Sequence, residues 1–172
     1  MLLAGIGVSA CERETSAYRG PDLPPADLPA ADVVSIYRAA AGASLQIGNP
    51  DLSILVDPLY LPRTAGLAGG DSIPPELLRA LRATRWVKGA CSIPVTPQSD
   101  PLRCDAERAG YVVRYSPPFA CGGDTVQVHM VVQQYAIPGG PVEQRMRFER
   151  AYHVVRAGST WRALSEARMP PP

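Results

Sequence analysis

Three glycine-containing turns divide the carboxy-terminal part of the chain, and this pattern constrains the fold more than any other feature. The turns are Gly122-Gly123-Asp124, Pro138-Gly139-Gly140-Pro141 and Gly158-Ser159. Strand-like segments lie before, between and after them, at residues 111–115, 125–137, 144–156 and 160–167. Short turns that join strand patterns connect neighbouring antiparallel strands. The sequence therefore predicts an antiparallel β-meander.

The segment Thr125–Ile137 has the clearest alternation. One predicted face carries Val126, Val128, Met130 and Val132, and the other carries Gln127, His129, Val131 and Gln133. A period of two is typical of a strand with one face on a core.

The amino-terminal half predicts helices instead of hairpins. A first helix is expected over Asp32–Ala41, with Asp32 as N-cap and Gly42 just beyond its end. A short strand with alternating Ile54 and Val56 follows and stops at Asp57-Pro58.

A second short helix is expected to start at Pro74-Pro75, because proline is tolerated in the first turn of a helix. Its buried stripe would consist of Leu77, Leu78 and Leu81. Helices come first and hairpins follow, so the predicted class is α+β. The expected architecture is two short helices followed by and packed on an antiparallel meander of about four to six strands.

The last strands, with Tyr152-His153-Val154-Val155-Arg156-Ala157-Gly158-Ser159-Thr160-Trp161-Arg162, resemble those of the cone-shaped NTF2-like fold. That resemblance covers about the last third of the chain. It implies an apolar pocket between helices and sheet, with His129 or Asp57 as a polar group in it. A small apolar ligand, or a minor enzymatic activity, would use such a pocket.

The amino terminus carries a second resemblance. Met1–Ala10 is uncharged and mostly apolar, and Val8-Ser9-Ala10-Cys11 resembles the lipobox of bacterial lipoproteins. The resemblance implies cleavage before Cys11 and a diacylglycerol on its sulfur. The run is too short for a transmembrane helix, which needs about 20 apolar residues. A plain amino-terminal segment, buried or dipping into a membrane, is the alternative.

Residues 1–11 are therefore expected to be a signal and lipobox, and residues 12–31 a tether. The tether is rich in proline and acidic residues, and proline-rich spacers are extended and semi-rigid. A single α+β domain is expected over residues 32–169, with a tail at 170–172.

A lipidated Cys11 would imply export, and an exported chain sits in an oxidising compartment. With Cys11 lipidated, Cys91, Cys104 and Cys121 remain, and three cysteines allow one disulfide. The favoured pair is Cys91 with Cys104, because the proline-rich loop between them has few other anchors; Cys121 is then a free thiol. A Cys104–Cys121 pair and the absence of any disulfide are the alternatives. The cysteine and histidine spacing predicts no metal site and no cofactor.

Few residues are candidates for chemistry. His129 and His153 lie in mid-strand, Asp57 ends a strand, and Ser116 precedes two prolines in a turn. Arg145 and Arg147, with Glu149, alternate along one strand face. Arg145, Arg147, His129 and Asp57 are the candidates for ligand or partner contact, and none is predicted to be catalytic.

A formal net charge of +1 gives no basic field for nucleic acid. The lipobox resemblance, the tether, the cysteines and the lack of a catalytic constellation together predict a non-catalytic, membrane-anchored envelope lipoprotein. It would reach the membrane through the lipid on Cys11, on the periplasmic or extracellular face, and act as an accessory or binding subunit for a protein partner in a membrane complex. An NTF2-like pocket protein is the alternative.

Overall fold

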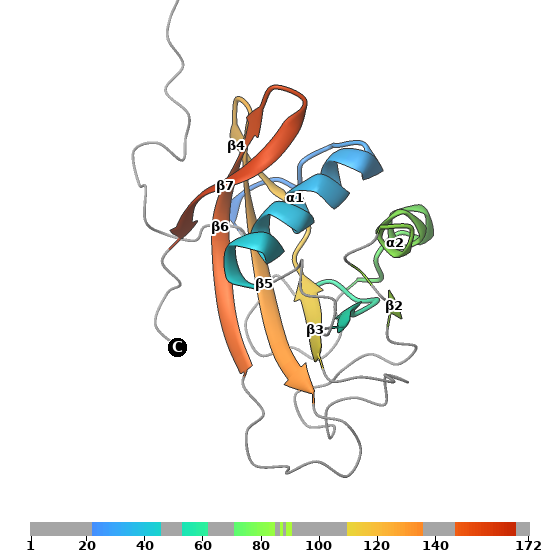
Figure 1. Ribbon diagram of the computed structural model, residues 1–172. Coiled ribbons are helices and arrows are strands. Elements are labelled where there is room, and N and C mark those ends of the chain that lie inside the picture. Colours follow the sequence, from blue (N-terminus) through green and yellow to red (C-terminus); the bar gives the residue numbers. More distant parts are fainter. Residues whose placement is uncertain are drawn as a thin grey trace, which may run out of the picture.

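A computed structural model describes residues 22–45, 53–61, 71–84, 87, 89–90, 110–135 and 147–167. It contains two helices and a seven-stranded mixed sheet (Figure 1). The elements in chain order are α1 (Ala30–Ser44), β1 (Ser53–Val56), α2 (Pro75–Arg82), β2 (Gly89–Ala90), β3 (Gly110–Tyr115), β4 (Phe119–Gly122), β5 (Thr125–Tyr135), β6 (Arg147–Ala157) and β7 (Thr160–Ala167). The fold class is α+β, as predicted, with one strand more than expected.

The sheet has the order β2-β1-β3-β5-β6-β7, and β4 pairs with the other end of β5. Strands β3, β5, β6 and β7 form the predicted antiparallel meander. The expectation of a purely antiparallel sheet is wrong at one edge, where β1 runs parallel to both β2 and β3. Parallel neighbours require a crossover connection, and the segment containing α2 connects β1 to β2.

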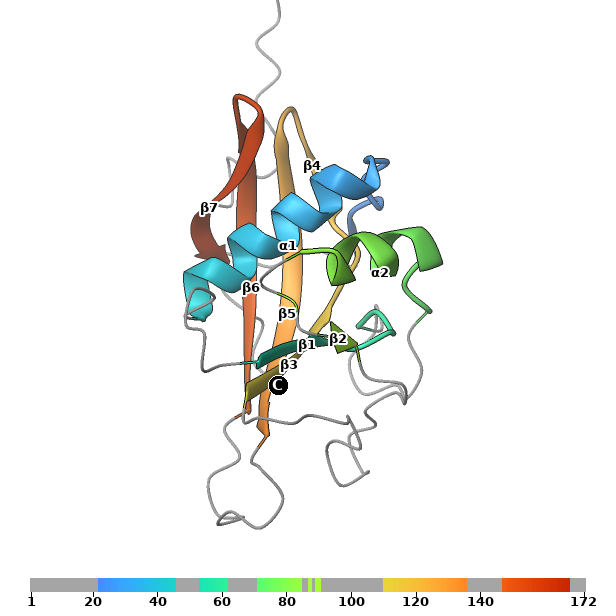
Figure 2. The same cartoon turned by 45° about the vertical axis from the view of Figure 1, so that its right-hand side comes forward.

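Both helices lie on the same face of the sheet (Figure 2). Helix α1 contributes Ile36 and Tyr37 to the interface, and α2 contributes Leu77 and Leu81. The sheet residues that meet them include the predicted apolar set of β5: Val126, Val128, Met130 and Val132. The alternation along β5 therefore assigned the core face correctly. In α2 the expected stripe is also present, with Leu78 only partly buried.

Strands β3 and β4 lie along β5 in one line, separated by Ser116-Pro117-Pro118. Proline lacks a backbone donor, so the ladder is interrupted there. Residues that were expected to belong to the tether pack against β4 and against the prolines that precede it. The Pro24 carbonyl accepts a 2.9 Å hydrogen bond from the Ala120 backbone N–H, and the Ala26 N–H donates to the Pro118 carbonyl at 2.8 Å. Part of the predicted tether therefore belongs to the domain.

Helix α1 is longer than expected at both ends. Asp32 is not its N-cap, because the helix begins at Ala30 and Pro29 precedes it. The Asp32 carboxylate instead accepts hydrogen bonds from Arg156 Nη2 at 2.6 Å and Trp161 Nε1 at 3.1 Å. These bonds hold the pKa of Asp32 below its usual value, and an acidic residue in the first turn also suits the helix dipole.

The carboxy-terminal end of α1 runs through Gly42, where the sequence predicted a stop. Glycine costs about 1 kcal/mol in a helix interior. Tertiary contacts offset this cost: Ala41 is fully buried, and the Ser44 hydroxyl hydrogen-bonds the Tyr152 hydroxyl on β6.

We expect Asp32→Asn to lower the free energy of unfolding by about 1 kcal/mol, because a charge-assisted bond to a partly exposed arginine is lost. Asp124→Asn is the matched control. Its carboxylate lies 4.0 Å from Arg156 Nε and is 74% exposed, so we expect a change below about 0.5 kcal/mol. Urea unfolding of both variants measures the difference. Equal losses would contradict the assignment.

Candidate functional site: the outer row of the sheet

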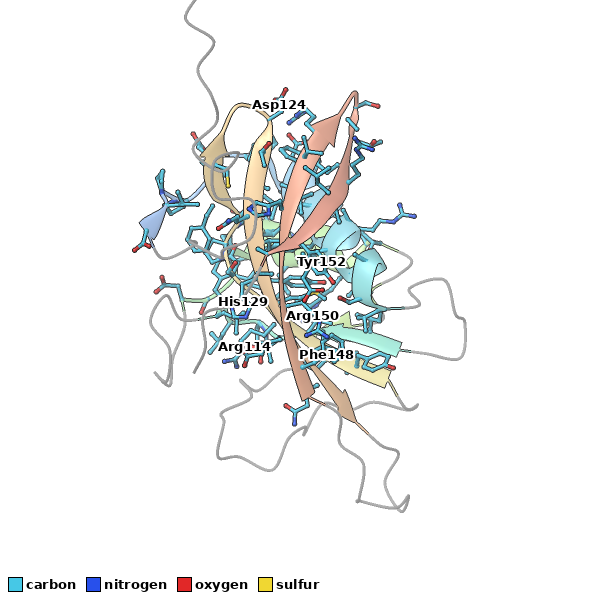
Figure 3. The ribbon with its side chains drawn as sticks, turned by 90° about the vertical axis from the view of Figure 1, so that its left-hand side faces the viewer. Arg114, Asp124, His129, Phe148, Arg150 and Tyr152 are labelled. Atoms are coloured by element: carbon cyan, nitrogen blue, oxygen red, sulfur yellow. The ribbon has the colours of Figure 1, made fainter. Side chains whose placement is uncertain are left out.

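The sheet face that turns away from the helices carries a row of polar side chains, which we call the outer row. It consists of Arg114 from β3, Gln127 and His129 from β5, and Glu149 and His153 from β6. In Figure 3, Arg114 and His129 lie on the side of the sheet away from α1, whereas Tyr152 points toward α1. The strand register places Gln127 opposite His153, and Val131 between Arg114 and Glu149.

Asp57 and Arg114 form a buried ion pair at one end of this row. Asp57 follows β1, and its Oδ2 lies 2.7 Å from Arg114 Nη2. The two side chains are 1% and 14% exposed. The other carboxylate oxygen of Asp57 accepts the Leu59 backbone N–H at 2.9 Å, which is the turn bond expected for a strand-ending Asp-Pro. Asp57 was a candidate for ligand contact, but its burial and these bonds give it a structural role.

His129 lies beside Glu149. Its Nε2 is 3.6 Å from Glu149 Oε2, with side-chain exposures of 13% and 43%. The His129 backbone N–H donates to the Ser116 Oγ at 3.0 Å, and the Ser116 hydroxyl donates to the Pro117 carbonyl. Ser116 is therefore a turn residue, as expected. An imidazole next to a carboxylate can contact a polar partner.

Gln127 and His153 form a buried cross-strand pair. Their Nε2 atoms are 2.8 Å apart, and the residues are 0% and 4% exposed. With the amide donating, His153 must accept as a neutral imidazole. Burial lowers the pKa of His153, which favours this neutral form.

This pair predicts a pH dependence of stability. Because the pKa of His153 in the folded protein lies below 6.5, the unfolded chain takes up the proton first as the pH falls. The stabilisation is complete above about pH 6.5. As the pH falls below this value, the stabilisation decreases by up to about 1.4 kcal/mol per pH unit until the pH reaches the pKa of His153 in the folded protein.

Urea unfolding between pH 5 and 8 measures this slope. His153→Gln stays neutral and should flatten it, whereas His129→Gln is the control and should retain it. A slope unchanged in His153→Gln would contradict the role of His153.

The space between α1 and the sheet, where a ligand pocket was expected, contains two stacked tyrosines. The ring centroids of Tyr37 and Tyr115 are 4.1 Å apart, and both residues are fully buried. The Tyr37 hydroxyl donates to the Ser116 carbonyl at 2.9 Å. Burial raises the pKa of both tyrosines above the usual value, so they remain neutral hydrogen-bonding core residues.

The structure places the other candidates only in part. Arg147 is the first residue of β6, opposite Gln133; its side chain and all of Arg145 lie outside the described residues. Arg114, Glu149 and Gln127 complete the row. Gln127 and Glu149 were predicted to lie on strand faces but were not candidates, and Arg114 was not singled out. The alternation along each strand indicates which residues share a face, but it does not indicate which distant strands pair with one another.

Cys121 corrects a further prediction. It is not a free thiol: it is 1% exposed and forms a disulfide whose second cysteine lies outside the described residues. The Cys91–Cys104 pair and the lipidation of Cys11 also fall outside them. With four cysteines in the chain, a lipidated Cys11, a Cys91–Cys104 bond and a bonded Cys121 cannot all occur in one molecule.

No family model matches the chain, and the comparisons found no similar curated protein and no similar solved structure. Within the described ranges, no group of three or more potential ligand side chains is arranged to hold a metal ion. In the same part of the chain, no helix has the length and apolar character needed to cross a bilayer. The features on which a functional proposal can be based are therefore the α+β architecture and the outer row.

Two contacts hold members of the outer row by hydrogen bonds, and a third pair lies close together without one. Asp57 pairs with Arg114, Gln127 with His153, and His129 lies next to Glu149. Paired buried polar groups fix the positions of strands and contribute to a defined surface. Glu149 is the member most open to a partner.

Proposed function

We propose that this protein is a non-catalytic accessory or binding subunit that works outside the cytoplasm, at the bacterial cell envelope. The observation that carries the proposal is the disulfide at buried Cys121. Structural disulfides form and persist in oxidising compartments and are rare in the cytosol.

The outer row supports the non-catalytic part of the proposal. Arg114, Gln127 and His153 are held by hydrogen bonds to Asp57 or to each other, as a positioned surface requires. Catalytic groups, in contrast, are held in a cleft beside a space for substrate. The lipid anchor on Cys11 stays a prediction from the lipobox resemblance.

Fractionation of cells that produce the full chain with a carboxy-terminal tag tests the proposal. We expect the tag to be digested by protease in spheroplasts but not in intact cells, and Cys121 to resist maleimide until reductant is added. Native electrophoresis of the detergent-solubilised envelope should show the chain in a species larger than the monomer. A cytosolic, monomeric protein with a reactive Cys121 would contradict the proposal.

A further inference from the structure

The strand register fixes where Cys121 lies relative to the other cysteines. Cys121 follows Ala120, which is opposite Val126 on β5. Val113 is opposite Val132, six residues farther along β5. At about 3.3 Å per strand residue, Val113 lies about 20 Å from the Ala120 end of this line. The partner of Cys121 is Cys11, Cys91 or Cys104.

Cys91 is too far away. It is bonded to Ala90, which pairs with Val56, and Val56 pairs with Val113. Two strand spacings of about 4.8 Å, added at right angles to the 20 Å along β5, place Ala90 about 22 Å from Cys121. The Cα atoms of a disulfide lie within about 7 Å, and one residue adds only about 3.8 Å.

Cys104 also falls short. Six residues connect it to Gly110, which is opposite Tyr135 at the far end of β5. From Tyr135 to Val126 is nine residues, or about 30 Å. Six extended residues span at most about 21 Å, and the disulfide itself adds about 7 Å. Even a straight connection would leave a gap.

Cys11 has ample reach. Pro24 lies beside Ala120, with the 2.9 Å hydrogen bond between its carbonyl and the Ala120 N–H. Thirteen residues separate Cys11 from Pro24, enough to span about 43 Å when extended. The segment therefore enters the domain next to the buried sulfur of Cys121.

We infer that Cys121 is bonded to Cys11, so that a disulfide fastens the amino-terminal segment to β4. Cys91 and Cys104 then form the second pair, as the sequence predicted. The sulfur of Cys11 cannot also carry a thioether-linked lipid.

The bond forms by thiol–disulfide exchange. The thiols of Cys11 and Cys121 lose two protons and two electrons in total, and an oxidant disulfide, such as glutathione disulfide or the disulfide of an oxidoreductase, is reduced to two thiols. The oxidising compartment proposed above supplies that oxidant. This inference goes beyond the proposed function, which requires only that Cys121 be oxidised.

Trypsin separates all four cysteines, so peptide mapping of the non-reduced full-length protein is decisive. Cleavage after arginine and lysine places them in residues 1–13, 89–103, 104–108 and 115–145. We expect 1–13 linked to 115–145 and 89–103 linked to 104–108, with both links lost on reduction. A link from 115–145 to either other peptide would overturn the pairing but keep the proposed location. A lipid-modified fragment beginning at Cys11 would also overturn it, and a free Cys121 in cells would overturn both proposals.

Serine variants give an independent measurement. Cys11→Ser and Cys121→Ser should each lower the midpoint of thermal unfolding by roughly 5–10 °C. The double variant should lose no more than either single one, because both remove the same bond. Cys11→Ser should make Cys121 reactive toward maleimide in denaturant, whereas the control Cys91→Ser should leave it blocked. Additive losses, or a blocked Cys121 in Cys11→Ser, would overturn the inference.

Discussion

Replacing Asp57 by alanine is expected to lower the free energy of unfolding by about 3–5 kcal/mol. The side chain is 1% exposed and lies 2.7 Å from Arg114 Nη2. Removing one partner of a buried ion pair leaves the other charge poorly compensated in a region of low dielectric. The variant also removes the acceptor of the Leu59 backbone N–H. Urea unfolding at pH 7 measures the loss.

Two variants identify the cause of that loss. Asp57→Leu combined with Arg114→Met removes both charges and should recover much of the stability, because apolar replacement of a whole buried pair is often neutral. Glu149→Gln removes a 43% exposed carboxylate from the same face and should change stability by less than about 0.5 kcal/mol. A single Asp57→Ala variant that loses less than about 1 kcal/mol would show that the pair contributes little.

Replacing Tyr37 by alanine should have a comparable effect, about 3–5 kcal/mol. The substitution removes a fully buried ring, its stacking on Tyr115 and its hydrogen bond to the Ser116 carbonyl. Large-to-small core changes lose the transfer free energy and leave a cavity. Thermal or urea unfolding measures the change.

Tyr37→Phe is the matched control for the ring. It keeps the packing and removes only the hydroxyl, so we expect a loss of about 1–2 kcal/mol. If the phenylalanine variant were as unstable as the alanine variant, the hydroxyl and not the ring would hold α1 to the sheet.

The elements with local sequence signals were predicted well. Strand β7 has the expected bounds, Thr160–Ala167, and the turn at Gly158 is present, with a positive φ of 63° that suits glycine. Strand β4 was not predicted, because Phe119-Ala120-Cys121 stands between a double proline and the glycine turn at Gly122-Gly123-Asp124. Its strand character depends on pairing with β5.

The candidate site was harder to predict because its contacts are long-range. Asp57 was recognised as a strand-ending residue, but its partner Arg114 is 57 residues away. Nothing in the local pattern indicates that β1 would run parallel to β3 and align these two side chains. His153 was likewise assigned to a strand, but its burial follows from its register with Gln127.

The contact of Asp32 with Arg156 and Trp161 joins positions 124 and 129 residues apart. The Asp32 carboxylate on α1 can therefore bind Arg156 and Trp161 only after the last strands have been synthesised. Folds dominated by such non-local contacts form slowly, because the entropy of closing long loops must be lost first. A chain of this kind completes its core only late in synthesis. If the protein works outside the cytoplasm, as proposed above, this delay would keep it competent to thread through a translocation channel.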